Sequence, residues 1–317
     1  MIRSPAARAI AAAVLLSLAG YGGERREAPG TTAALGGALS EPQAYSLFGE
    51  PLYAQNDTTG AIAAADSSLA EAPDDVERLI AAGRARRNSW QYRQEIGLYT
   101  RAMELAPADW RLYRFRGHRY ISLRDFGAAI SDLEKARDLA PLNWDVAYHL
   151  GLAYFVAGRF GDAAAEYRRC LDLAGDPAAQ EAHSEEFRSC SQNADDPESW
   201  VAMTEWAVRA SLRAGEKAAA ARLIGAIPLW LEVTENLAYY HNLLFYKRAK
   251  TAEELLNPGP NAPYRRETVG YGVANWRLAW GDTTGAVELL EELVQDPWWP
   301  GFGRIAAEAD LARLRPR

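Results

Sequence analysis

The sequence lacks the residue patterns that carry most metal and enzyme chemistry. It has four histidines and two cysteines in 317 residues, with no HExxH pair, no CxxC pair and no dense acidic cluster, so no metal site is predicted. A P-loop, a GxSxG turn and a GxGxxG loop after a strand are also missing. We therefore predict no catalytic residue and no cofactor.

Two further features of the composition indicate the class of fold and the kind of partner. Alternating runs of valine, isoleucine and threonine are nearly absent, whereas alanine, leucine, arginine and glutamate are abundant, which favours helices over sheets. The 35 basic side chains are outnumbered by 42 acidic ones, and there is no polybasic tail. Nucleic acid is therefore not an expected partner.

The N-terminal apolar run is too short to span a bilayer comfortably. It extends from Ala9 to Ala19, follows Arg3 and Arg8, and ends in small residues, which is the layout of a secretory signal peptide. We predict that residues 1–21 are a signal peptide, that no membrane span remains after cleavage, and that the protein is exported to the periplasm or cell envelope. A disordered apolar leader on a cytosolic protein is the alternative.

The end of this leader is similar to a bacterial lipoprotein cleavage box. Leu18, Ala19 and Gly20 fit the first three positions, but Tyr21 stands where such boxes have the lipidated cysteine. Because tyrosine has no thiol to acylate, no lipid anchor is expected there. The glycine- and alanine-rich residues 22–39 are predicted to form a flexible tether.

Several residue types recur with a period of 34. This spacing predicts units of two antiparallel helices, with glycine where the helices pass too close for a side chain and proline closing each unit. The glycines are Gly49, Gly83, Gly117 and Gly151, the prolines are Pro73, Pro107 and Pro141, and Tyr99, Leu133 and Tyr167 fall in the same register.

This pattern resembles the tetratricopeptide repeat (TPR), with units near 40–75, 76–109, 110–143 and 144–177. The resemblance implies an all-α fold, a right-handed solenoid of helical hairpins with a concave inner surface. The unit 76–109 departs from the pattern, with Arg86 at an aromatic position and Glu95 at a small one. The first unit carries Pro51 inside its expected first helix, so we expect an irregular cap.

After residue 177 the period breaks. A polar insert with Cys190 is expected over 178–197, and degenerate helical repeats with a C-terminal capping helix are expected over 198–317. We expect Trp298 and Trp299 to wedge between the last hairpin and the capping helix; an exposed aromatic contact for a partner is the alternative.

The two cysteines, Cys170 and Cys190, lie 20 residues apart in an apparently exported chain, which favours a disulfide between them. The alternative is that Cys170 is simply one of the small residues that its repeat position requires.

The resemblance also implies which side chains face the groove. They are Arg84, Arg87, Asn88, Arg111, Arg114 and His118 at a basic end, and Asp145, Tyr148, Leu152 and Phe155 towards an aromatic and apolar end. Some proteins of this family hold a peptide carboxylate with such basic side chains. Alternatively, the arginines pair with acids of the chain such as Glu77, Glu104 and Asp138, or remain solvated.

These features predict a non-catalytic scaffold of the bacterial cell envelope that binds a protein or peptide in its concave groove. A carrier or sensor of a small anionic or carbohydrate ligand is the alternative, with Trp144, Tyr148 and Phe155 as its site. An enzyme built on glutamate and histidine side chains is a third hypothesis, without a motif to support it.

Overall fold

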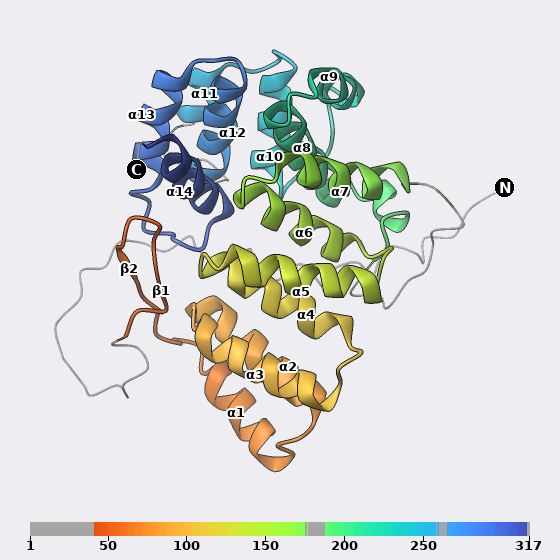
Figure 1. Ribbon diagram of the computed structural model, residues 1–317, viewed down its shortest axis with the longest axis vertical. Helices are drawn as coiled ribbons and strands as arrows, with labels where there is room; N and C mark the ends of the chain where they lie inside the picture. The colour runs from red at the N-terminus through yellow and green to blue at the C-terminus, as the bar shows by residue number, and fades with distance from the viewer. Residues whose placement is uncertain (1–40, 175, 177–187, 258, 260–264, 316–317) are drawn as a thin grey trace.

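The computed structural model describes residues 41–174, 176, 188–257, 259 and 265–315. The predicted signal peptide, the tether and the first half of the polar insert therefore lie outside the described residues. The N-terminal part begins with a short antiparallel hairpin, β1 (Ala44–Tyr45) and β2 (Pro51–Leu52). Seven helices follow: α1 (Ala61–Glu71), α2 (Val76–Arg86), α3 (Tyr92–Leu105), α4 (Trp110–Ser122), α5 (Phe126–Leu139), α6 (Trp144–Val156) and α7 (Phe160–Asp172) (Figure 1).

The C-terminal part continues with helices only. They are α8 (Pro197–Arg213), α9 (Lys217–Ala226), α10 (Leu237–Tyr246), α11 (Ala252–Leu256), α12 (Arg266–Ala279), α13 (Thr283–Leu293) and α14 (Phe302–Leu314). The all-α fold of stacked helical hairpins with a C-terminal helix is thus confirmed. Among the described residues, no helix is long and apolar enough to cross a membrane.

The period of 34 also sets where the first helix of each unit begins. Two residues after each periodic proline stands an acid or amide, and its side-chain oxygen accepts a hydrogen bond from a main-chain N–H of the first helical turn. These N-caps are Asp75 for α2, Asp109 for α4 and Asn143 for α6.

Three of the periodic glycines occupy the predicted helix contacts. A Cβ atom on Gly151 would lie 2.5 Å from the ring of Tyr167, and one on Gly83 would lie 2.6 Å from the ring of Tyr99. A Cβ atom on Gly117 would lie 2.7 Å from the side chain of Leu133. Each of these glycines in the first helix of a unit therefore packs against a side chain of the second helix that recurs with the same period.

Gly49 is the exception and corrects the prediction for the first unit. It lies in the turn of the β-hairpin with φ of 85°, a backbone conformation that suits glycine, and Pro51 lies in β2 instead of in a helix. The first unit therefore keeps its second helix, α1, and replaces its first helix with the hairpin.

Replacing Gly151 with alanine should destabilise the protein by about 1–3 kcal/mol, because the buried Tyr167 ring has to move. Gly97 is the matched control: it is exposed inside α3, and a Cβ atom there meets nothing within 4 Å. Gly97→Ala should stabilise by about 0.5–1 kcal/mol through helix propensity. Chemical denaturation measures both, and equal effects of the two substitutions would contradict the packing role of Gly151.

The turn between the two helices of a hairpin carries a second periodic signal. Trp90, Arg124 and Gly158 have positive φ and lie 34 residues apart. Gly215, Arg248 and Gly281 also have positive φ and lie 33 residues apart. The C-terminal part is therefore built from hairpins α8–α9, α10–α11 and α12–α13 with a period one residue shorter, which explains why its repeats look degenerate in sequence.

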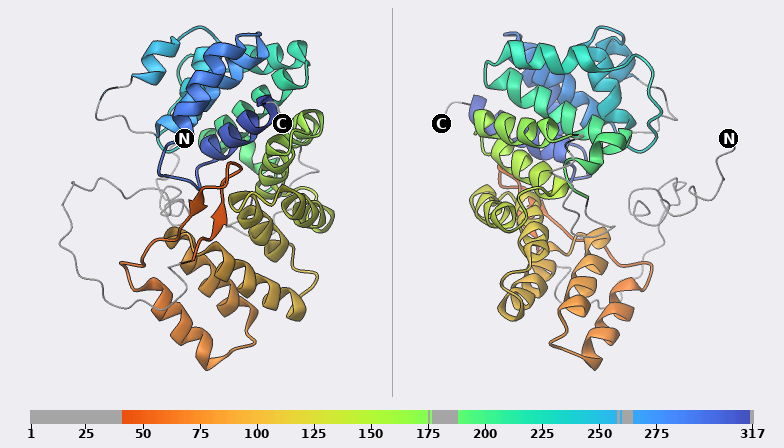
Figure 2. Two further views of the ribbon diagram at one scale, coloured as in Figure 1. Left: turned by 60° about the vertical axis from the view of Figure 1, so that its left-hand side comes forward. Right: turned by 90° about the vertical axis from the view of Figure 1, so that its right-hand side faces the viewer.

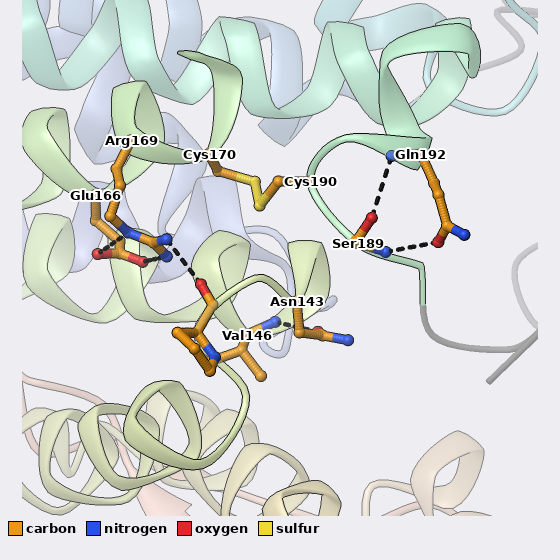
Figure 3. The surroundings of a disulfide bond; sticks show 9 residues. Asn143, Val146, Glu166, Arg169, Cys170, Ser189, Cys190 and Gln192 are labelled. Atoms are coloured by element: carbon orange, nitrogen blue, oxygen red, sulfur yellow. Dashed lines mark hydrogen bonds and ion pairs between the residues drawn. A yellow bond between two sulfur atoms is a disulfide. The ribbon is translucent and has the colours of Figure 1, made fainter. Parts of the chain in front are cut away.

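The disulfide between Cys170 and Cys190 is present and joins the end of the insert to α7 (Figure 3). The main chain around Cys190 also pairs with the turn before α6: the Cys190 N–H donates to the Leu142 carbonyl at 2.8 Å, and the Trp144 N–H donates to the Arg188 carbonyl at 3.1 Å. Residues 188–193 therefore form part of the folded body.

The C-terminal part packs back against the N-terminal part. Helix α14 contacts α6 as well as α12 and α13. The hairpin lies between the N-terminal helices and α14 (Figure 2). A buried ion pair joins Arg124 to Glu308 of α14, with Nη2 2.6 Å from Oε1. Trp299 contacts Trp90 and Tyr92, so it joins the α13–α14 loop to the N-terminal repeats and not only to the helices that flank it.

Candidate binding groove

The predicted aromatic end of the groove is filled by the chain itself. Leu152 and Phe155 have no exposed surface, and Phe155 packs edge to face against Trp206 of α8 at 5.2 Å and Tyr271 of α12 at 6.1 Å. Tyr148 is also buried, with its hydroxyl 3.3 Å from that of Tyr239 in α10. The expectation of an open aromatic end is therefore corrected: helices α8, α10 and α12 cover it.

The same finding removes the predicted small-ligand site. Trp144 is half-buried and stacks on Tyr148 at 5.1 Å, and Phe155 lies in the core. Tyr148 and Phe155 therefore present no open face to a ligand, and only Trp144 keeps part of its surface exposed. The sequence could not show this, because it does not tell where the C-terminal hairpins pack.

Two of the predicted basic residues are engaged by acids of the chain. Arg111 binds Asp109, with Nη2 2.6 Å from Oδ2, and Glu77, with Nη2 2.5 Å from Oε1. Arg114 binds Asp145, with Nη2 2.6 Å from Oδ1. The predicted alternative was that the arginines pair with acids of the chain. It is confirmed for Arg111, which pairs with Glu77.

His118 is half-buried and packs against α6 and α14. Its ring lies 4.4 Å from that of His149 and 5.2 Å from that of Phe302 in α14, measured between ring centres. Burial, and then repulsion from Arg119 and His149, lower the pKa of His118 well below its usual value. The side chain is therefore neutral at physiological pH and adds no positive charge to the groove.

The remaining basic residues meet at a small cavity between α2, α3 and α4, which we call the arginine niche. Its volume is about 10 Å³, enough for one water-sized group. The niche is lined by Arg84, Arg87, Glu95, Tyr99, Arg114, Phe115 and Arg119. Of the predicted groove residues, Arg84 and Asn88 are exposed, and Arg87 is partly buried.

Positive charge exceeds negative charge among the residues that line the niche. Four arginines share it with one carboxylate, Glu95, which accepts a hydrogen bond from the Tyr99 hydroxyl at 2.8 Å and lies 3.7 Å from Arg119. Burial, followed by repulsion from Arg119, lowers the pKa of Arg87. Burial also raises the pKa of Glu95, and attraction by Arg119 opposes that rise. A bound anion would relieve the repulsion among these cations.

Four niche residues, Glu95, Tyr99, Phe115 and Arg119, were not predicted as groove residues. A signal for Glu95 was available: it stands at the repeat position that holds Ala129 and Ala163 in the next two units. A carboxylate at a position that normally takes a small residue indicates a local polar partner, and here the partner is Arg119 on α4.

The hairpins, the glycine contacts and the periodic turns define an α-helical repeat protein. A family model described as the tetratricopeptide repeat matches residues 116–179, which confirms that the chain carries repeats of this kind. Within the described residues, no group of three or more histidine, cysteine, aspartate or glutamate side chains could hold a metal ion.

Two solved structures are similar to the chain at 14% sequence identity. One is YrrB, described as a TPR protein with an unusual peptide-binding site; the match has a TM-score of 0.43 and covers 79% of this chain and 100% of that one. The other is yeast Tom70, with a TM-score of 0.33 and coverage of 81% of this chain and 58% of that one. A search of curated proteins found no match.

Proposed function

We propose that this protein is a non-catalytic scaffold of the bacterial cell envelope that binds an anionic peptide segment, in particular a C-terminal carboxylate, at the arginine niche. The observation that carries the proposal is the charge imbalance of the niche, where Arg84, Arg87, Arg114 and Arg119 surround a single lining carboxylate, Glu95. Guanidinium groups bind carboxylates through paired, charge-assisted hydrogen bonds.

The geometry favours Arg84 and Arg87 as the residues that meet the partner. Arg119 is buried beside Glu95, so it is not accessible from outside. Arg84 is exposed and Arg87 is partly buried at the same cavity. The niche is too small to enclose a small molecule, so a carboxylate would bind at its mouth with the rest of the peptide lying outside.

A library of random ten-residue peptides tests this proposal when it is offered once with free C-termini and once with amidated C-termini. We expect selection of acidic sequences with a free carboxylate. Arg84→Ala and Arg87→Ala should each weaken binding about tenfold, because each removes a charge-assisted contact. Affinity should also fall with added salt.

The matched control is Arg266→Ala, because Arg266 is also exposed but lies on α12 and pairs with Glu292. This variant should bind the selected peptides as the wild type does. Equal binding by wild type and by the Arg84 and Arg87 variants, or equal selection of amidated peptides, would exclude the niche as the peptide site.

The location in the envelope is part of the proposal. It is supported by the leader of residues 1–21, which has the layout of a signal peptide, and by the Cys170–Cys190 disulfide, a bond that forms in oxidising compartments. Intact-mass measurement of the protein from the envelope of its native cell should show a chain without the leader and without a diacylglyceryl group.

A further inference from the structure

A larger pocket lies where the N-terminal hairpin meets the loop before α14. We call it the seam pocket. Its volume is about 510 Å³, within the range of about 300–1,000 Å³ that is usual for small-molecule sites. It is lined by residues 50–55, Trp90, Arg265, residues 296–299 and Arg304. None of these residues belongs to the arginine niche.

Aromatic side chains form one wall of the seam pocket. The ring of Trp90 lies 5.0 Å from that of Trp298 and 5.6 Å from that of Trp299, both edge to face. The Trp299 indole N–H donates to the Tyr53 carbonyl at 2.9 Å, and the Tyr53 side chain is 46% exposed at the pocket. The wall thus combines fixed indoles with one accessible phenol ring.

The turn between α2 and α3 places Trp90 in this wall. Trp90 occupies the periodic turn position at which φ is positive in each hairpin, with φ of 55° here and Gly158 at the equivalent position two repeats later. The turn holds its indole against both Trp298 and Trp299.

The charges of the pocket are balanced. Two carboxylates, Glu50 and Asp296, stand with two guanidinium groups, those of Arg265 and Arg304. Arg304 lies 3.3 Å from Glu308 and 3.8 Å from Glu50, while Arg265 covers the Trp298 ring at 3.7 Å. A pocket without net charge has no long-range attraction for an ion, so its ligand should be neutral.

Much of the main chain of the wall is already paired. The Leu52 carbonyl accepts from the Gln43 N–H at 2.7 Å, the Tyr53 carbonyl accepts from Trp299, and the Gln55 N–H donates to the Ser89 carbonyl at 2.8 Å. These paired main-chain groups are not available to a ligand, so side chains are the main polar partners that the wall offers.

We propose that the seam pocket binds a neutral oligosaccharide of two or three sugar units. Flat aromatic faces such as that of Tyr53 match the C–H face of a sugar ring. The carboxylates of Glu50 and Asp296 and the amide of Gln55 can exchange hydrogen bonds with its hydroxyl groups. This combination of apolar wall and polar rim fits a ligand whose rings have one apolar face and a polar edge.

Isothermal titration with cellotriose, maltotriose, chitotriose and mannotriose tests the proposal. At least one should bind, and its affinity should be nearly independent of salt because the ligand is neutral. Tyr53→Ala should weaken that binding about tenfold, since it removes the accessible stacking surface. Tyr45→Ala is the matched control: Tyr45 is 56% exposed on the same hairpin but is not part of the pocket lining.

Glu50→Gln is a second test that does not depend on the aromatic wall. It should weaken binding because it removes a carboxylate at the rim of the pocket. Circular dichroism of each variant verifies folding. The proposal is overturned if no trisaccharide binds, or if Tyr53→Ala and Glu50→Gln both leave trisaccharide binding unchanged. It is also overturned if the peptide decaproline binds at the seam pocket and none of the trisaccharides does. Peptide binding at the arginine niche is measured separately with the Arg84 and Arg87 variants, so either proposal can fail alone.

Discussion

Replacing Arg124 with methionine should lower the free energy of unfolding by about 3–5 kcal/mol, because it leaves the carboxylate of Glu308 buried with one of its two arginine partners removed. Arg124 Nε and Nη2 lie 3.0 and 2.6 Å from the two Glu308 oxygens, and both side chains are almost fully buried. Arg124 also donates to the Trp299 carbonyl at 2.9 Å. The substitution therefore removes both polar links from this arginine to the α13–α14 loop and α14.

Arg159→Met is the control, because the Arg159–Asp162 pair is exposed and should contribute less than about 1 kcal/mol. The double variant Arg124→Met/Glu308→Met should be less destabilised than the sum of Arg124→Met and Glu308→Met, since the buried carboxylate that loses Arg124 is itself absent. Urea denaturation measures the wild type and the four variants. A loss of less than 1 kcal/mol in Arg124→Met would show that the pair does not hold the two parts together.

The repeats could be predicted from the sequence because their contacts are local. Gly151 meets Tyr167 only 16 positions later, inside one hairpin, so the spacing of residue types directly records the packing. The glycine contacts recur in the three units from α2 to α7, and their recurrence made them visible without an alignment. The N-caps that follow each proline are equally local, although they were not predicted.

The closure between the two ends could not be predicted for the opposite reason. Arg124 and Glu308 are 184 residues apart, and no periodic pattern relates them. The aromatic residues at Tyr148 to Phe155 were consistent with an open groove or with a core. The choice depended on where α8, α10 and α12 pack, which is a tertiary property. The same limit applies to Trp299, whose partners lie in the first half of the chain.

The arginine niche lies between these two cases. Arg84 and Arg87 could be assigned to the inner face from their repeat positions, but their exposure at a shared cavity depends on how α2, α3 and α4 pack together. Glu95 of α3 and Arg119 of α4 complete that cavity. The candidate site is therefore smaller than the whole predicted groove. It consists of the α2–α3 hairpin and the face of α4 that packs against it.

Removal of the Cys170–Cys190 disulfide should cost about 3 kcal/mol, because a bond across 20 residues restricts the unfolded chain. We expect the Cys170→Ala/Cys190→Ala variant and the wild type in reductant to unfold at similarly reduced urea concentrations. Reductant should not change the stability of the variant, which is the control. Thiol titration of the unfolded, unreduced wild type should detect no free thiol, and two thiols would show that the bond does not form.

The disulfide stabilises two parts of the structure, the core around α7 and the start of α6. Cys170 packs in the core with Tyr167, and Cys190 anchors the strand-like pairing of Ser189 with Asn143, the N-cap of α6. Reduction should therefore loosen the start of α6 as well as the insert, and hydrogen exchange of the Val146 amide, which is bonded to Asn143, should accelerate. Because the bond persists only in an oxidising compartment, this stabilisation is available to the protein there and is lost in a reducing cytosol.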